Sequence, residues 1–281
     1  MAGKRYAPPA FAATSSATTL RIMNENMQRL AQTSRPSLRD LTPARVSLAT
    51  TGDSIATDEV LSFQLAHARA RDAVHAMLDL PSFAQRFRTE LPILDIASIS
   101  VLQLRSNAPD RATYLRHPDF GRTLHRDSVA VLRPTSCDLA ITIADGLSAL
   151  AIERNAIPVL AHLLPKLLAD TWTLAPITLL QQGRVGISDA IGSCLGAKCS
   201  VILIGERPGL SSHDSMGAYL TWAPHPDRTD ADRNCLSNIR KGGLSPELAA
   251  DRLFAYLQIA RATQRTGTSL KEGSRELHSA S

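Results

Sequence analysis

The second half of the chain alternates short, continuously apolar segments with segments of helical periodicity. The clearest apolar segments are residues 138–144 and 199–204, where apolar side chains stand at consecutive positions. Strands that are apolar on both faces belong to parallel sheets covered by helices on both sides. We therefore predict an α/β fold with a mostly parallel, Rossmann-like sheet flanked by helices. The strand candidates are residues 138–144, 177–180, 199–204 and 218–223.

Helical periodicity separates these strand candidates. One helix is expected to start at Ser148, with Pro158 as a kink or a break. A shorter helix is expected from Ser188 to Gly196, and a last amphipathic helix is expected to start at Ser245. The pattern strand, helix, strand is the second indication of a parallel sheet.

The residues before the strands are expected to form a helical N-terminal region. An apolar stripe that begins near Phe63 and runs to Met77 predicts a helix that starts at Thr57 and that Pro81 ends. Residues 106–121 contain several Asn, Pro and Asp residues and are interpreted as a turn-rich connection.

Residues 1–43 have the composition of a flexible N-terminal extension, rich in Ser, Thr, Ala and Pro. One helical face within them is apolar, and it is either a docking peptide or the first helix of the folded body. We divide the chain into the extension (1–43), a helical region (44–126) and an α/β domain (127–281). The apolar face consists of Leu20, Met23, Met27 and Leu30.

The net charge of +5 is concentrated at the start of the chain, where residues 1–49 carry seven basic and two acidic side chains. The remaining residues carry 24 of each sign, so net charge gives no support for nucleic-acid binding by the body. The longest uncharged apolar-rich stretch contains Pro176 and is shorter than the roughly 20 residues of a membrane span. The sequence predicts neither a membrane segment nor a secretory signal, and its 4 cysteines lack zinc-site spacing. An intracellular location is expected.

Ligands of such sheets bind beyond the carboxyl ends of the strands, so residues 145–148 and 205–209 are the candidate binding loops. Neither segment has the glycine spacing of a dinucleotide or phosphate loop. The chain also lacks a Gly-x-Ser-x-Gly elbow and a paired-histidine zinc motif. These residues alone indicate an α/β binding scaffold.

Two longer segments carry a family resemblance. Residues 205–219, Gly-Glu-Arg-Pro-Gly-Leu-Ser-Ser-His-Asp-Ser-Met-Gly-Ala-Tyr, and residues 228–239, Arg-Thr-Asp-Ala-Asp-Arg-Asn-Cys-Leu-Ser-Asn-Ile, resemble the small subunit of ethanolamine ammonia-lyase. The resemblance covers about residues 44–273. It departs at residues 50–54, which are less rich in Arg and Gly, and at Trp222, where Tyr is expected. Shorter segments that match in the same order are 65–74, 119–123, 145–148 and 183–189.

The resemblance implies a function. Proteins of this family convert ethanolamine to acetaldehyde and ammonia through radicals generated from adenosylcobalamin. The large subunit contains the catalytic barrel, and the small subunit closes over the cobalamin at their interface. The chain is then expected to form a hetero-oligomer with the large subunit, to carry no catalytic residue and no metal ligand of its own, and to reside in the cytoplasm within a bacterial microcompartment.

The resemblance also assigns three cofactor-binding residues, Val185, Glu206 and Cys235. Each has a simpler interpretation: Val185 as a core residue at the start of a helix, Glu206 as the ion-pair partner of Arg207 or another arginine, and Cys235 as a packed thiol. Arg207 and Ser237 are further candidates for contacts with cofactor phosphate or amides.

Two other functions stay open. A stand-alone α/β enzyme could use Asp145, Ser148 and Glu206 on a small substrate. A non-catalytic microcompartment scaffold would contact no cofactor.

Overall fold

The computed structural model describes residues 38–42, 44–268 and 270, and these fall into two compact units divided after Glu59. The first unit contains the short helix α2 (Leu38–Leu41) and a hairpin of β1 (Thr50–Thr51) and β2 (Ser54–Ile55). The apolar helix face expected at residues 20–30 lies outside the described residues.

The second unit is built on a six-stranded sheet with the order β3-β5-β4-β6-β7-β8. The pairings among β3, β5, β4 and β6 are parallel, and β7 pairs antiparallel with both β6 and β8, which confirms a mostly parallel sheet. The sequence analysis missed β3 and β8, the two edge strands. The strands are β3 (Val101–Arg105), β4 (Leu139–Ala144), β5 (Ile177–Gln181), β6 (Cys199–Gly205), β7 (Met216–Trp222) and β8 (Arg233–Ile239).

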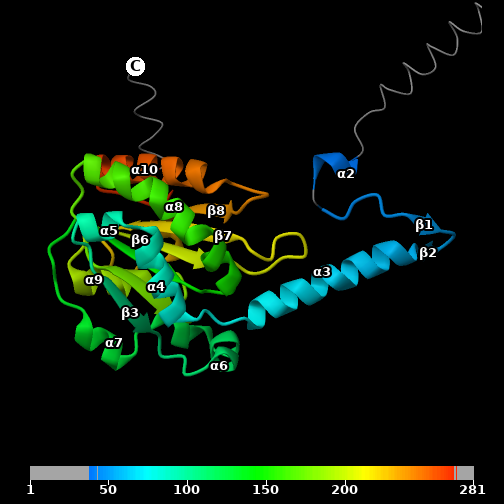
Figure 1. The fold of residues 1–281 in the computed structure, drawn as a ribbon, viewed down its shortest axis with the longest axis horizontal. Helices are drawn as coiled ribbons and strands as arrows, with labels where there is room; N and C mark the ends of the chain where they lie inside the picture. The colour runs from blue at the N-terminus through cyan, green and yellow to red at the C-terminus, as the bar shows by residue number, and fades with distance from the viewer. Residues whose placement is uncertain (1–37, 43, 269, 271–281) are drawn as a thin grey trace, which may run out of the picture. The chain divides into compact units, whose positions relative to one another are not determined.

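Helices cover both faces of this sheet (Figure 1). On one face, α4 (Leu80–Glu90) packs against β3 and β5, and α8 (Ala149–Ala169) packs against β4, β6 and β7. On the same face, α10 (Pro246–Thr263) packs against α8, β7 and β8. On the other face, α9 (Ile187–Leu195) packs against β4 and β6. Every residue of β4 and β6 is buried, so the continuous apolar runs in the sequence reflect this two-sided burial.

Helix α3 (Thr57–His75) ends before Pro81, so the expected end of this helix was wrong. Pro81 instead lies in the first turn of α4, where the missing N–H of proline costs no hydrogen bond. The Asp79 side chain caps this turn and accepts a hydrogen bond from the Ser82 amide at 3.3 Å. The next helix, α5 (Ile93–Ile96), leads into β3.

The segment 106–121 was expected to be a turn-rich connection, and this expectation was wrong for much of it. It contains α6 (Arg111–Arg116), and the short helix η1 (Pro118–Arg122) begins in it. Asp110 caps α6 by accepting a hydrogen bond from the Thr113 amide at 2.7 Å. Asp110 and Pro118 therefore mark helix starts in this segment, and α7 (Arg126–Val131) follows.

Helix α8 is continuous through Pro158 and Pro165. Packing against the sheet and against α10 along its length holds it helical, although each proline removes one backbone hydrogen bond. Within the described ranges, no helix is both long enough and apolar enough to span a membrane.

Candidate functional site

The candidate site lies at the carboxyl ends of β4, β5 and β6, where three loops meet. Asp145 follows β4, Arg184 lies in the loop after β5, and Glu206 follows β6. Helix α6 and η1 are joined to this edge, because the Arg184 amide donates to the Gly121 carbonyl at 2.7 Å and the Tyr114 hydroxyl donates to Gly183 O at 2.8 Å. Residues from distant parts of the sequence therefore surround the loops.

Asp145 is buried and braces this edge. Its Oδ1 accepts a hydrogen bond from the Gln182 amide at 2.6 Å, and its Oδ2 lies 3.7 Å from Nη1 of Arg111. Arg111 also donates to the carbonyls of Gly146 at 2.7 Å and Val74 at 2.9 Å. Burial raises the pKa of Asp145 to about 6, although the Arg111 charge and backbone hydrogen bonds oppose this shift. The Asp145–Arg111 pair therefore fixes the loop between β4 and α8.

Tyr114 lies between two guanidinium groups. Its ring centroid is 5.0 Å from the Arg111 guanidinium carbon and 4.4 Å from that of Arg184. The ring is fully buried, and burial raises the pKa of the Tyr114 hydroxyl above its ordinary value. Arg184 is thereby held over the ring while its buried Nε lacks a hydrogen-bond partner among the described residues.

A pocket of about 230 Å³ opens beside these groups and contains two of the three predicted site residues, Val185 and Glu206. Two glycines let its loops approach each other. A Cβ on Gly146 would lie 2.3 Å from the Gly205 carbonyl oxygen, and a Cβ on Gly205 would lie 2.1 Å from that of Ser148. The pocket is lined by Tyr114, Gly146, Leu147, Arg184, Val185, Ile204, Gly205, Glu206, Arg207 and Tyr219.

Glu206 accepts hydrogen bonds from three groups. The Ser215 hydroxyl donates to Oε2 at 2.5 Å, the Ser237 hydroxyl donates to Oε1 at 2.6 Å, and the Asn238 amide donates to Oε2 at 3.2 Å. The alternative of an ion pair with Arg207 or another arginine is not found in the described part of the chain. A carboxylate offers about four acceptor directions, so these three donors leave one for a ligand.

Cys235, the third predicted residue, is exposed and lies outside the set that lines the pocket. It stands opposite Tyr219 in the register of β7 and β8, and the Tyr219 hydroxyl is hydrogen-bonded to its thiol. Tyr219 lines the pocket, so it links Cys235 to Val185 and Glu206. The structure thus brings Val185 and Glu206 together in one pocket and leaves Cys235 outside its lining, level with Ile202 in the strand register.

A second pocket, of about 570 Å³, shares Arg184 and Val185 with the first. We name it the arginine pocket, because four arginines line it: Arg122, Arg184, Arg228 and Arg233.

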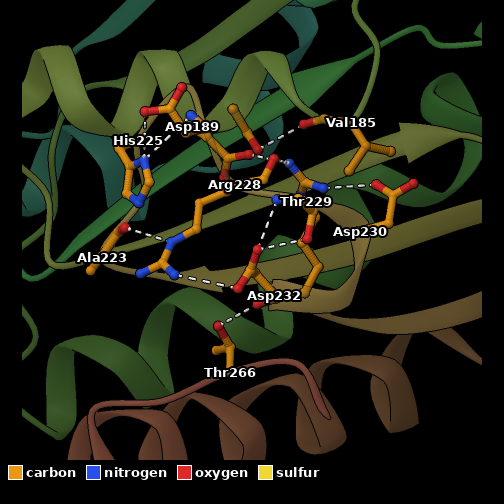
Figure 2. Close-up of polar contacts among 12 residues, drawn as sticks. Val185, Asp189, Ala223, His225, Arg228, Thr229, Asp230, Asp232 and Thr266 are labelled. Carbon is orange, nitrogen blue, oxygen red and sulfur yellow. Dashed lines mark hydrogen bonds and ion pairs between the residues drawn. The ribbon is translucent and has the colours of Figure 1, made fainter. Parts of the chain in front are cut away.

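A polar network at the arginine pocket includes η2 (Asp230–Asp232). Figure 2 shows Arg228, whose Nε donates to the Ala223 carbonyl at 3.0 Å and whose Nη1 lies 3.4 Å from Asp232. Arg233 is nearly buried and pairs with Asp189 and, at 2.7 Å, with Asp230. Burial raises the pKa of Asp189, and the Arg233 hydrogen bond opposes the shift.

Sequence reasoning missed Tyr114, Tyr219 and the arginine pocket. The Tyr219–Cys235 contact depends on the register of two antiparallel strands, one of which was not predicted. Arg184 stood in a segment that had been singled out, 183–189, but its stacking on Tyr114 comes from α6, which had been interpreted as a loop.

The side chains proposed for a stand-alone enzyme do not form a catalytic set. Ser148 is buried, caps α8 by accepting from the Ala151 amide at 3.2 Å, and donates to the His213 carbonyl at 2.9 Å. Asp145 is committed to Arg111 and to the Gln182 amide. Over the residues that the structure describes, no cluster of three metal-ligating side chains occurs either.

Comparison with known proteins assigns the family. The family model described as "Ethanolamine ammonia-lyase light chain (EutC)" matches residues 32–271. The "Ethanolamine ammonia-lyase small subunit" of Pseudomonas putida strain KT2440 is 49% identical over 249 residues, covering 86% of this chain and 89% of that protein. The protein of the same name from Pseudomonas aeruginosa strain LESB58 is 48% identical over 241 residues, covering 84% and 86%. The chain therefore belongs to the ethanolamine ammonia-lyase light-chain family.

Proposed function

We propose that this chain is the small subunit of an adenosylcobalamin-dependent ethanolamine ammonia-lyase, which converts ethanolamine to acetaldehyde and ammonia. In this proposal it closes over the cobalamin at its interface with the large subunit, which carries the catalytic residues. One observation supports this role most strongly: Val185 and Glu206, which come from different loops, line the same pocket.

The chemistry of the pocket fits cobalamin. The corrin ring is an apolar surface rimmed by carboxamides, which both donate and accept hydrogen bonds. Val185 supplies an apolar surface, Glu206 retains an acceptor direction, and the guanidinium groups of Arg184 and Arg207 bring N–H donors to the lining. The pocket thus offers all three kinds of contact that a corrin rim requires.

When bound, cobalamin supplies the radical chemistry. The residues of this chain bind and orient it. Glu206 accepts an amide N–H, and the Ser215 and Ser237 hydroxyls fix the direction of its carboxylate. Tyr219 lines the pocket and is hydrogen-bonded to the Cys235 thiol. Arg111 and Asp145 hold the loop between β4 and α8, so that the pocket does not have to be ordered when the cofactor binds.

The test is reconstitution. We expect the purified chain to release no ammonia from ethanolamine with adenosylcobalamin, and activity to appear when the large subunit is added. Ammonia release by this chain alone would contradict the proposal and favour a stand-alone enzyme. Full activity of the large subunit without this chain would contradict it in favour of a scaffold. A microcompartment location follows from the family resemblance only, and fluorescence imaging of the tagged chain tests it.

A further inference from the structure

The arginine pocket has more positive than negative charge. Three aspartates neutralise two of its arginines, since Arg228 pairs with Asp232 and Arg233 pairs with Asp189 and Asp230. These two arginines are therefore fixed parts of the framework.

The other two arginines of the pocket, Arg122 and Arg184, have no carboxylate partner in the part of the chain that the structure describes. Both belong to backbone segments joined by the hydrogen bond from the Arg184 amide to the Gly121 carbonyl, at 2.7 Å. Both residues therefore line one cavity from neighbouring segments, and Arg184 does so while its guanidinium lies over the Tyr114 ring. The four arginines and three aspartates leave a net charge of about +1, which an anion with one negative charge would neutralise.

The pocket is also shaped for close approach of a ligand. Gly186 lines it, and a Cβ at this position would meet only Arg233 Nη2, at 3.6 Å, so the backbone is open there. The Arg233 side chain is 5% exposed and is paired with Asp189 and Asp230, so the guanidinium donors that remain for a ligand are those of Arg122 and Arg184. Arginine binds phosphate oxygens through parallel N–H donors, so this donor set favours a phosphate-type oxyanion.

We propose that the arginine pocket binds a phosphate group with one negative charge. The most direct source of such a group is the phosphodiester in the nucleotide loop of cobalamin. For this source, the inference rests on the proposed function. The arginine pocket shares Arg184 and Val185 with the pocket of Glu206, so one molecule with a corrin ring and a phosphodiester reaches both. Free inorganic phosphate, whose singly charged form is present at neutral pH and offers the same oxygen acceptors, is the second source.

The test compares two corrinoids on the assembled two-subunit complex, by equilibrium dialysis with absorbance readout. Cyanocobalamin contains the phosphodiester, whereas dicyanocobinamide lacks it together with the ribose and the base. We expect Arg122→Gln to weaken cyanocobalamin binding about 5- to 20-fold and to leave dicyanocobinamide binding unchanged. The matched control is Arg126→Gln, because the Arg126 side chain is 91% exposed and lies outside the pocket lining. It should alter neither affinity.

A second arm measures the melting temperature of the same complexes with inorganic phosphate. A phosphate-dependent rise in the wild-type complex that Arg122→Gln abolishes, without any corrinoid discrimination, assigns the pocket to free phosphate. If Arg122→Gln changes neither the corrinoid affinities nor the phosphate response, or weakens both corrinoids equally without a phosphate effect, the anion site is refuted. A wild-type complex that binds neither corrinoid refutes the proposed function instead, and the phosphate arm still decides on the pocket.

Discussion

Asp145 and Glu206 follow neighbouring strands of one sheet, β4 and β6, but different groups stabilise their carboxylates. Asp145 is 2% exposed and has Arg111 beside it, whereas Glu206 is half-buried and bonded to hydroxyls and a backbone amide. A charge fully removed from water needs an opposite charge, and a charge at a pocket rim does not. The comparison teaches that the buried pair builds the site and the partly exposed carboxylate is free to bind a ligand.

Removing the cation of the buried pair should have the largest effect on folding. We predict that Arg111→Met lowers the free energy of unfolding by about 3–5 kcal/mol, because it leaves the Asp145 carboxylate buried without a partner. Urea denaturation measures the change. Arg116→Met, on the exposed end of the same helix, is the control and should cost far less. An equal loss of unfolding free energy in the two variants would contradict the structural role of the Arg111–Asp145 pair.

The titration of Asp145 should also be visible in stability. Burial raises its pKa to about 6, so the folded chain holds this proton more tightly than the unfolded chain, in which the aspartate pKa is about 3.9. The resulting stabilisation is present at low pH and is lost as the pH rises through 6. Between pH 4 and 7 the wild type should lose up to about 3 kcal/mol relative to Asp145→Asn. Parallel pH profiles of the two proteins would show that Asp145 titrates normally.

A smaller effect is expected from Tyr114→Phe. This change removes the hydroxyl that donates to the Gly183 carbonyl at 2.8 Å and keeps the ring between Arg111 and Arg184. We predict a loss of about 1 kcal/mol in the free energy of unfolding, with cobalamin affinity of the complex changed less than about three-fold. A loss of affinity without a loss of stability would place Tyr114 with the ligand-binding residues.

The sequence predicted the central sheet better than its edges. β4 and β6 are buried on both faces, and their short, largely apolar runs are typical of such strands. The edge strand β8 mixes exposed Cys235 with buried Leu236, and its position depends on pairing with β7, which no local pattern contains.

The candidate site shows the same limit. Glu206 could be located from sequence because it directly follows an apolar strand, and ligands of such sheets bind at this end. The arginine pocket could not, because its lining comes from η1, the loop after β5 and the segment before β8. Only the folded chain shows that Arg228 and Arg233 are neutralised by aspartates and that Arg122 has no carboxylate partner within the described residues.

The most direct test of the account is the cobalamin dissociation constant of the assembled complex with Glu206→Gln and Glu206→Ala, measured together with the melting temperature. Charge-assisted hydrogen bonds contribute about 1.5–3 kcal/mol, so Gln, which keeps one acceptor oxygen, should weaken binding about ten-fold or less and Ala should weaken it more. The melting temperature should fall by less than about 4 °C for Gln. Glu90→Gln, a carboxylate whose side chain is 51% exposed at the end of α4, is the control and should change neither quantity. Unchanged affinity with a large fall in melting temperature would show that Glu206 is structural, and would contradict its role at the cobalamin interface.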